Sequence, residues 1–489
     1  MAVNLQVQNS LIDIENLGLY VNGEWLTTLK SGTFKIKNPS TKELIAEVPK
    51  GGREEAKAAI KAAEAAFPGW KSLTAAERAD YMLKLRDLML EHQEELATIM
   101  SMEMGKAYNE SKAEVNFSAS FLTWYSEEGK RIYGETVPAS APNKRLMVIK
   151  QPVGVVAAIT PWNFPLGMLA RKLAPALAAG CPSVIKPASQ ATLSALALAK
   201  LAEMAGYPKG VINIVAGSTR EISDELFDHP AVKKISFTGS TEVGKELVKK
   251  SARRLKKLSL ELGGHAPFIV FEDADLEKAA SGAVASKFRN SGQTCICANR
   301  IYVHRNVKKK FSELFVEKVK ELKVGNSLDS SVEIGPLVNE GGLNKVKEHV
   351  DDAVQKGAEV LCGGNTSDEG NGYFYEPTVM DNITDDMKIM SEETFGPVAP
   401  IAVFDDDEEV IKKANDTEYG LAAYLYTSNL ERAVLVSESL NFGVVGLNDA
   451  IPSVAQAPFG GMNESGYGRE GGHQGIRDYL EEKFISLGI

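Results

Sequence analysis

The alternation of short β-branched segments with helical segments between residues 147 and 262 constrains the fold of this chain more than any other feature. Residues 153–159, 183–185, 211–215, 234–237 and 258–260 read as strands, and residues 166–179, 192–205, 221–227 and 242–252 read as helices. This order and spacing are typical of a parallel sheet with crossover helices. Such sheets bind ligands beyond the carboxyl ends of their strands. We therefore expect functional loops at residues 160–165, 186–190, 217, 238–240 and 261–264.

The sequence continues with further α/β units on the carboxyl side of this segment. A second alternating stretch begins near Pro267 and extends to about Gly446, and residues 459–475 are glycine-rich and read as loop. On the amino side, residues 53–66 and 75–103 carry apolar residues at helical spacing. A chain of 489 residues is too long for one hydrophobic core. We therefore predict two α/β lobes joined near residue 262.

Composition excludes several classes of function. A net charge of -10 argues against nucleic acid as a partner, because phosphate binding needs clustered basic residues. The apolar run 166–185 is interrupted by Arg171 and Lys172, so we expect no membrane-spanning segment. Four cysteines form no disulfide framework, and residues 1–20 lack the features of a secretory signal, which together predict a cytoplasmic protein. Six histidines without metal-binding spacing predict no metal site.

The decapeptide at residues 288–297 places Cys295 directly after a Gly-Gln-Thr turn, with Arg289 upstream and Cys297 two residues downstream. Cysteine is the best intrinsic nucleophile among side chains, and a polar, partly exposed turn suits a reactive thiol. Most free cysteines, however, are small core residues. The decapeptide alone leaves both interpretations of Cys295 open.

Other loops carry groups that suit catalysis or nucleotide binding. Glu261 ends a strand at a Gly-Gly loop, as a general base can, although a capping or surface glutamate is commoner. Asn163 lies between two prolines and can donate to an oxyanion, or can simply form a turn. Lys186 suits a ribose or phosphate contact. The turn at Gly239 opens a helix whose amino end can face a diphosphate, but G-x-G-x-x-G is absent, so any dinucleotide binds in a variant way.

Taken together, these motifs resemble the NAD(P)-dependent aldehyde dehydrogenase superfamily. The resemblance covers the chain from about residue 20 to its end, with all motifs in family order. They are Thr160-Pro-Trp-Asn-Phe-Pro165, Lys186-Pro-Ala-Ser189, Phe237-Thr-Gly-Ser240, Glu261-Leu-Gly-Gly264, Gly292-Gln-Thr-Cys295, Glu393-Thr-Phe-Gly-Pro397 and Pro458-Phe-Gly-Gly461.

The resemblance implies an α/β fold of the aldehyde dehydrogenase type in three parts. Residues 1–130 and 151–261 would form a cofactor-binding domain of variant Rossmann type, and residues 262–465 an α/β catalytic domain. Residues 131–150 and 475–489 would form a small β oligomerisation arm. Members of the family assemble as dimers or tetramers, so a homodimer or homotetramer is expected.

The resemblance also implies the roles of individual residues. Cys295 would be the nucleophile, Glu261 the general base, and Asn163 with the amide of Cys295 the oxyanion hole. A thiohemiacetal would then give a thioester, which water hydrolyses. The expected cofactor contacts are Thr160, Pro161, Trp162, Lys186, Ser189, Gly217, Gly239, Ser240, Leu262, Glu393 and Phe395.

Two arginines indicate an aldehyde with an anionic tail. Arg171 and Arg289, with Ser453, resemble the succinate-semialdehyde dehydrogenase branch, and an arginine fixes a carboxylate bidentately. Each arginine can instead pair with an acidic residue of the fold. The alternatives are a 2-oxoglutarate semialdehyde dehydrogenase and a broad-specificity aldehyde dehydrogenase.

Two further hypotheses concern the cofactor and oxidation. NAD-preferring relatives often have Glu where this chain has Ser189, and a Glu there repels a 2′-phosphate. We therefore expect NADP, with NAD as the alternative. Cys297 suggests a redox switch with Cys295, or else it is a plain core cysteine.

Overall fold

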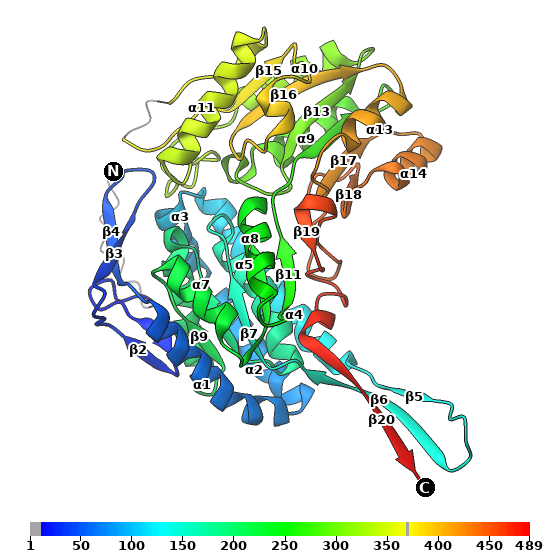
Figure 1. The fold of residues 1–489 in the computed structure, drawn as a ribbon. Coiled ribbons are helices and arrows are strands. Elements are labelled where there is room, and N and C mark those ends of the chain that lie inside the picture. The colour runs from blue at the N-terminus through cyan, green and yellow to red at the C-terminus, as the bar shows by residue number, and fades with distance from the viewer. Residues whose placement is uncertain (1–10, 368–370) are drawn as a thin grey trace.

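The computed structural model describes residues 11–367 and 371–489. Figure 1 shows two lobes and a long β arm that projects from the first lobe and ends at the C-terminus. Residues 1–10 lie outside the described residues. They are part of the predicted cofactor-binding domain and of residues 1–20, where no secretory signal is expected.

The first lobe contains an eight-stranded sheet in the order β19-β11-β10-β7-β8-β9-β1-β2. Strands β7 to β11 are parallel to their neighbours, as the sequence predicts, whereas β1, β2 and β19 pair antiparallel. The strands are β1 (Leu19–Val21), β2 (Glu24–Leu26), β7 (Val155–Ile159), β8 (Ser183–Lys186), β9 (Ile212–Ile214), β10 (Val232–Thr238), β11 (Lys257–Glu261) and β19 (Gly466–Tyr467). The predicted strands therefore all exist, and β19 adds an edge strand from the glycine-rich segment that reads as loop.

Helices cover both faces of this sheet. Helices α5 and α6 contact the sheet and are themselves covered by α2, α3 and α4, while α1 contacts the sheet and packs against α7. The helices are α1 (Arg53–Ser72), α2 (Ala75–Glu91), α3 (Gln93–Met104), α4 (Tyr108–Glu128), α5 (Pro165–Ala179), α6 (Thr192–Ala205), α7 (Thr219–Asp228) and α8 (Thr241–Ser251). Helix α1 continues past the predicted end at residue 66, through Pro68, because buried Trp70 donates to Leu177 O at 3.2 Å.

The second lobe contains a seven-stranded sheet in the order β14-β15-β16-β13-β12-β17-β18, which is parallel except for the β14–β15 pair. One apolar core on each face separates it from its helices. The strands are β12 (Ala266–Val270), β13 (Ala298–His304), β14 (Glu359–Cys362), β15 (Thr378–Asp381), β16 (Val398–Phe404), β17 (Ala422–Tyr426) and β18 (Val444–Leu447). The helices are α9 (Leu276–Lys287), α10 (Lys308–Lys320), α11 (Glu340–Gln355), α12 (Lys388–Ser391), α13 (Asp407–Asn415) and α14 (Leu430–Ser439).

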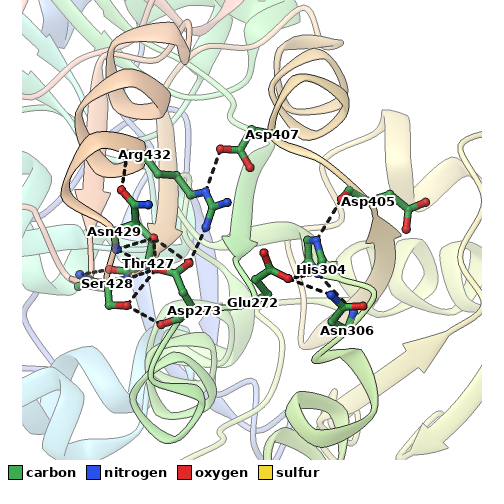
Figure 2. A network of polar contacts seen from close by, with 11 residues as sticks. Glu272, Asp273, His304, Asn306, Asp405, Asp407, Thr427, Ser428, Asn429 and Arg432 are labelled. Atoms are coloured by element: carbon green, nitrogen blue, oxygen red, sulfur yellow. Dashed lines mark hydrogen bonds and ion pairs between the residues drawn. The ribbon is translucent and has the colours of Figure 1, made fainter.

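A polar network joins the carboxyl ends of the strands in the second lobe (Figure 2). Asp273, which follows β12, accepts hydrogen bonds from Thr427 Oγ1 and from the backbone amides of Ser428 and Asn429, each at 2.7 Å. Arg432 on α14 donates to Asp273 at 2.7 Å and to Asp407 at 2.8 Å. These contacts hold the ends of β12 and β17 to the first turn of α14.

Two smaller sheets complete the fold. The arm contains β5 (Glu135–Val137), β6 (Lys144–Pro152) and β20 (Leu480–Gly488) in the order β20-β6-β5, and β3 (Thr33–Lys37) pairs with β4 (Leu44–Pro49). Strand β6 extends two residues beyond residue 150. The predicted domain boundaries stay a prediction. The predicted cofactor-binding part contains strands of two sheets, and β19 of the eight-stranded sheet lies outside all the predicted parts. No helix of the described residues is both long and apolar enough to cross a bilayer.

Candidate active site

One pocket of about 280 Å³ collects residues of both lobes around Cys295. It lies beyond the carboxyl ends of β7, β10 and β11, where the parallel sheet predicts a ligand site. The predicted site residues in its wall are Pro161, Trp162, Asn163, Arg171, Gly239, Ser240, Leu262, Arg289, Cys295, Glu393, Phe395 and Ser453. Thr160, Lys186, Ser189, Gly217, Glu261 and Cys297 are not part of this wall.

The loop before Cys295 has an unusual backbone. Asn290, Ser291 and Gly292 have φ angles of 51°, 56° and 73°, a left-handed run that only glycine and asparagine adopt readily. Ser291 is held there because its hydroxyl donates to Gly335 O at 2.8 Å. A Cβ at Gly292 would lie 2.2 Å from Gly396 O, so the close approach of the two loops requires glycine. This turn presents Cys295 at the pocket wall.

Cys295 is half-buried, but its thiol is not activated by its surroundings. Burial, helped by the nearby Glu393 and Glu261 carboxyls and opposed by Arg171, raises the pKa of the thiol to about 12. The protonated thiol is therefore the favoured form of Cys295 at neutral pH. Cys295 is partly exposed on its turn, as expected, and its role as the nucleophile stays a prediction.

Asn163 lies in the pocket wall in a heavily hydrogen-bonded loop. Its side-chain amide donates to Gln293 O at 3.0 Å, two residues before Cys295. Its own carbonyl oxygen accepts from Lys106 Nζ at 2.8 Å and from Asn290 Nδ2 at 3.0 Å. Because an amide nitrogen carries two hydrogens, one remains to donate toward the pocket.

Glu261, at the end of β11, lies behind the pocket wall. Its side chain is buried, and neither carboxyl oxygen has a hydrogen-bond partner. A Cβ at Gly460 would lie 2.8 Å from Glu261 Oε1, so the carboxyl group occupies space that only glycine leaves free. Burial and the charge of Glu470 raise the pKa of Glu261 well above its usual range, against Lys172 and two arginines. Burial without a hydrogen-bond partner therefore favours the neutral form of the Glu261 carboxyl group.

A buried ion pair that sequence reasoning missed lies beside Glu261. Lys172 on α5 pairs with Glu470 and donates to Thr238 Oγ1 at 2.6 Å. Ser236 Oγ donates to the same carboxylate of Glu470 at 3.1 Å. Glu470 Oε2 has no hydrogen-bond partner. The charge of Glu470 raises the pKa of Glu261, and the charge of Lys172 lowers it.

The predicted cofactor residues in the pocket wall lie around the amino end of α8. Ser240 caps that helix by accepting from Val243 N, at 3.4 Å, and Gly239 precedes it. Glu393 accepts from Gly264 N at 3.1 Å, and burial raises the pKa of its carboxyl to about 7. The Trp162 and Phe395 rings meet edge to face with centroids 5.6 Å apart. This set combines a helix amino end, a carboxyl and two aromatic faces.

The remaining predicted cofactor residues lie at or just after the carboxyl ends of β7, β8 and β9, outside the pocket wall. Thr160 N donates to Lys186 O at 3.1 Å, and burial lowers the pKa of Lys186 to about 8. Ser189 is half-buried in a short 3-10 helix, Ser189–Ala191. At Gly217 a Cβ would lie 2.2 Å from Gly51 O. Backbone packing therefore accounts for this glycine without a ligand.

Arg171 is buried in the pocket wall without an acidic partner. Its Nη2 donates to Ser453 Oγ at 3.0 Å, and its Nε has no hydrogen-bond partner. The guanidinium lies over the rings of Phe459, Phe121 and Phe117, at 4.1, 5.3 and 5.5 Å from their centroids. No Asp or Glu of the described chain forms an ion pair with it. The alternative that Arg171 merely pairs with an acidic residue of the fold is therefore wrong.

Arg289 lies in the same pocket wall and is half-buried. Its guanidinium lies over the ring of Phe164, 5.1 Å from the centroid. It forms no ion pair with any residue that the structure describes, although Glu110 is near enough for the two charges to interact. The structure thus brings Arg171, Arg289, Ser453 and Cys295 together in one pocket.

Cys297 is buried behind the pocket and is a free thiol, as is Cys295. It donates to Gly292 O at 3.3 Å, and Lys287 Nζ lies 3.7 Å from its sulfur. Burial raises the pKa of its thiol. A redox switch with Cys295 stays a prediction.

Helix α4 carries a face at the pocket that was not identified from the sequence. Glu110, Glu114, Phe117 and Phe121 recur at helical spacing, so they share one face. Phe117 lies in the pocket wall, and its ring meets that of Phe121 edge to face at 5.0 Å. Their i, i+4, i+7, i+11 pattern was visible in the sequence, but nothing there indicated what the face packs against.

Comparison with known proteins agrees with this geometry. The model of the aldehyde dehydrogenase family matches residues 25–485. The chain therefore belongs to the aldehyde dehydrogenase family, the class of NAD(P)-dependent enzymes that the sequence motifs indicated.

Particular relatives are similar over nearly their whole length. A succinate-semialdehyde dehydrogenase [NADP(+)] of Escherichia coli (strain K12) is 52% identical over 96% of this chain and 97% of its own. A glutarate-semialdehyde dehydrogenase of Pseudomonas putida is 51% identical, with the same two coverages. A crystal structure of succinate-semialdehyde dehydrogenase from Burkholderia pseudomallei matches with a TM-score of 0.97 at 48% identity, covering 99% of this chain and 100% of its own. The predicted fold and the predicted resemblance to the succinate-semialdehyde dehydrogenase branch are thus confirmed.

Proposed function

We propose that this protein oxidises succinate semialdehyde to succinate and reduces NADP. The observation that carries the proposal is the buried Arg171, which lacks an acidic partner and lies in the same pocket as Cys295. A buried charge is costly unless it is paired. An anionic group on the substrate supplies the missing partner.

The pocket fits a short aldehyde with a carboxylate at the far end. Arg171 has an unused Nε donor, and Ser453 Oγ beside it can also donate. Arg289 adds a second positive charge to the wall. Phe117 and Phe459 shape the pocket between these groups, so an apolar two-carbon spacer fits between the carboxylate and the aldehyde carbon. The succinate-semialdehyde dehydrogenases among its relatives support this substrate.

Residues of both lobes fit a nicotinamide dinucleotide. The amino end of α8, with Gly239 and Ser240, offers backbone amides and a positive dipole end to a diphosphate. Glu393 would hold the nicotinamide ribose and Lys186 the adenosine ribose. Ser189, where a carboxylate would repel a 2′-phosphate, favours NADP, as does the E. coli relative named for it. NAD is the alternative cofactor.

The chain's own groups account for the first half of the reaction. The Cys295 sulfur adds to the aldehyde carbon after a base takes the thiol proton, which gives a thiohemiacetal. The free hydrogen of Asn163 Nδ2, together with the amide of Cys295, stabilises the negative charge on the former carbonyl oxygen. Oxidised NADP, when bound, would supply the hydride acceptor, and loss of hydride from the thiohemiacetal carbon would leave a thioester on Cys295.

Glu261 is suited to the second half of the reaction. Its raised pKa makes its conjugate base a strong acceptor for a proton of water. The side chain lies behind the pocket wall, so it must turn toward Cys295 to activate that water. Attack of the water on the thioester releases the carboxylic acid and restores the Cys295 thiol.

An aldehyde panel assayed with NADP and with NAD at 340 nm tests the proposal. We expect the highest kcat/KM for succinate semialdehyde with NADP. A preference for 2-oxoglutarate semialdehyde or glutarate semialdehyde would replace the proposed substrate with a longer one. Equal activity on uncharged aldehydes would support a broad-specificity enzyme instead.

We also propose that the protein is a cytoplasmic homo-oligomer assembled through its arm. The arm projects from the first lobe (Figure 1) and exposes Val137, Phe484, Leu487 and Ile489. Exposed apolar side chains on projecting strands are typical of protein interfaces. The four free cysteines agree with a reducing compartment. Light scattering of the purified protein distinguishes a dimer from a tetramer.

A further inference from the structure

The Lys106–Glu114 ion pair is buried directly beneath the Asn163 loop. Lys106 and Glu114 are each 1% exposed. Lys106 follows α3, and Glu114 lies on the face of α4 that packs beneath the pocket. Such a pair needs a specific reason, because replacing a buried ion pair by apolar residues is often neutral or stabilising.

The ammonium group of Lys106 contacts Glu114, Asn163 and Phe164. It donates to Glu114, and to the backbone carbonyl oxygen of Asn163 at 2.8 Å. The ring of Phe164 faces the same ammonium group, 3.8 Å from its centroid. An ammonium group has three hydrogens, so these three partners satisfy it. Lys106 therefore holds Asn163 and Phe164 but does not line the pocket.

Glu114 holds the next part of the same segment. Its Oε1 accepts from the backbone amides of Leu166 and Gly167, both at 3.0 Å, and these amides belong to the first turn of α5. Helix α5 also carries Arg171, little more than one turn further on. The pair thus contacts the chain at Asn163, whose side-chain amide is the proposed oxyanion donor. It also contacts the start of α5, the helix that carries Arg171.

We infer that Lys106 and Glu114 are positioning residues that fix the side-chain amide of Asn163 toward the reacting carbonyl oxygen. The inference rests on the proposed role of Asn163. An oxyanion donor contributes only when it lies at hydrogen-bond distance from the position of the developing charge. Without the bond from Lys106 to its carbonyl oxygen, the Asn163 loop keeps only the Asn290 contact at that atom. The amide then samples orientations that miss the oxyanion.

A double-mutant cycle on the full-length protein tests this inference. Lys106→Met combined with Glu114→Gln removes both charges, and the remaining amide oxygen can still accept from Leu166 and Gly167. We expect this variant to keep its thermal unfolding profile and its NADP affinity, measured by fluorescence titration, but to lose about tenfold or more in kcat. In the Asn163→Ala background the same pair of substitutions should change kcat less than twofold, because the amide it positions is absent.

The matched control is Lys112→Met on α4, the helix that carries Glu114; its Nζ pairs with the exposed Glu94 at 3.1 Å. This variant should have wild-type kcat. If Asn163→Ala lowers kcat but the Lys106→Met/Glu114→Gln variant keeps wild-type kcat, the inference is overturned and the proposed role of Asn163 stands. Equal fold-losses in both backgrounds, or lost NADP affinity, would also overturn the inference by showing a general structural role. Wild-type kcat in Asn163→Ala would overturn the proposed oxyanion role and the inference together.

Discussion

The guanidinium Nη2 of Arg171 lies 3.0 Å from the hydroxyl oxygen of Ser453, although 282 residues separate the two in sequence. Arg171 comes from α5 of the first lobe, and Ser453 follows β18 of the second lobe. The contact therefore joins the two lobes at the wall of the pocket that contains Cys295. Arg171 forms no ion pair with an acidic side chain of the described residues.

Replacing Arg171 should remove selectivity for acidic aldehydes. Removing one partner of a desolvated charge pair costs about 2–5 kcal/mol, and a factor of ten corresponds to about 1.4 kcal/mol. We expect Arg171→Met to lower kcat/KM for succinate semialdehyde by about 30-fold or more, with a much smaller loss for butanal. Arg220→Met, at an exposed position of α7, is the matched control. An equal loss for both aldehydes would contradict the carboxylate contact.

Replacing Glu261 should separate the two halves of the reaction. Glu261→Gln cannot take a proton from water, and general bases contribute about 10²–10⁴-fold. In stopped flow at 340 nm we expect one enzyme equivalent of NADPH in a rapid burst, followed by a steady-state rate reduced by about that factor. Wild-type steady-state turnover would show that another group activates the water.

The same substitution should change stability in a pH-dependent way. The pKa of Glu261 is raised in the folded state, so the folded protein binds this proton more tightly than the unfolded chain. Its contribution to stability is present below the unfolded pKa of 4.5 and is lost as pH rises toward the folded pKa. Glu261→Gln should therefore raise Tm more at pH 8 than at pH 5. A Tm difference that is constant across this range would contradict the raised pKa.

Ser189→Glu should reverse the cofactor preference. The added carboxylate would repel the 2′-phosphate of NADP and accept from the 2′-hydroxyl of NAD. We expect the ratio of kcat/KM for NADP to that for NAD to fall by at least about tenfold. Gln190→Glu adds the same charge at an exposed neighbouring position and serves as the control. An unchanged ratio would place the adenosine ribose elsewhere.

Asp273→Ala should destabilise the second lobe without touching the active site. Burial alone would raise the pKa of Asp273, but hydrogen bonds from Thr427, Ser428 and Asn429 together lower it to about 2. Loss of this acceptor leaves several donors unsatisfied, which costs about 1–3 kcal/mol each when they are buried. We expect urea unfolding at pH 7 to show a loss of roughly 2 kcal/mol, while kcat stays unchanged.

The effect of Asp273 should also depend on pH. A carboxylate with a lowered folded pKa stabilises the fold above its unfolded pKa of 3.8, and this stabilisation is lost as pH falls toward about 2. The exposed Asp80→Asn should have no effect at any pH. A stability loss for Asp273→Ala that grows as pH falls would contradict the charged role.

Much of the fold follows from local patterns. Residues 192–205 form α6 with the bounds expected from the sequence, and the five predicted strands of the first sheet all exist, because helical and strand periodicities are local properties. Helix α1 is different. Local rules end it near Pro68, but burial of Trp70 against α5 carries it to Ser72.

The sequence by itself determined the family, the order of strands and helices, and the residue types of the site. Their motifs are short and contiguous, so they can be read without the third dimension. Only the tertiary structure decided the chemical states of those residues. The raised pKa values of Cys295 and Glu261, the missing partner of Arg171 and the grip of Lys106 on Asn163 all depend on burial and on groups distant in sequence. Desolvation and electrostatic interaction act through space, so the order of residues along the chain does not reveal them.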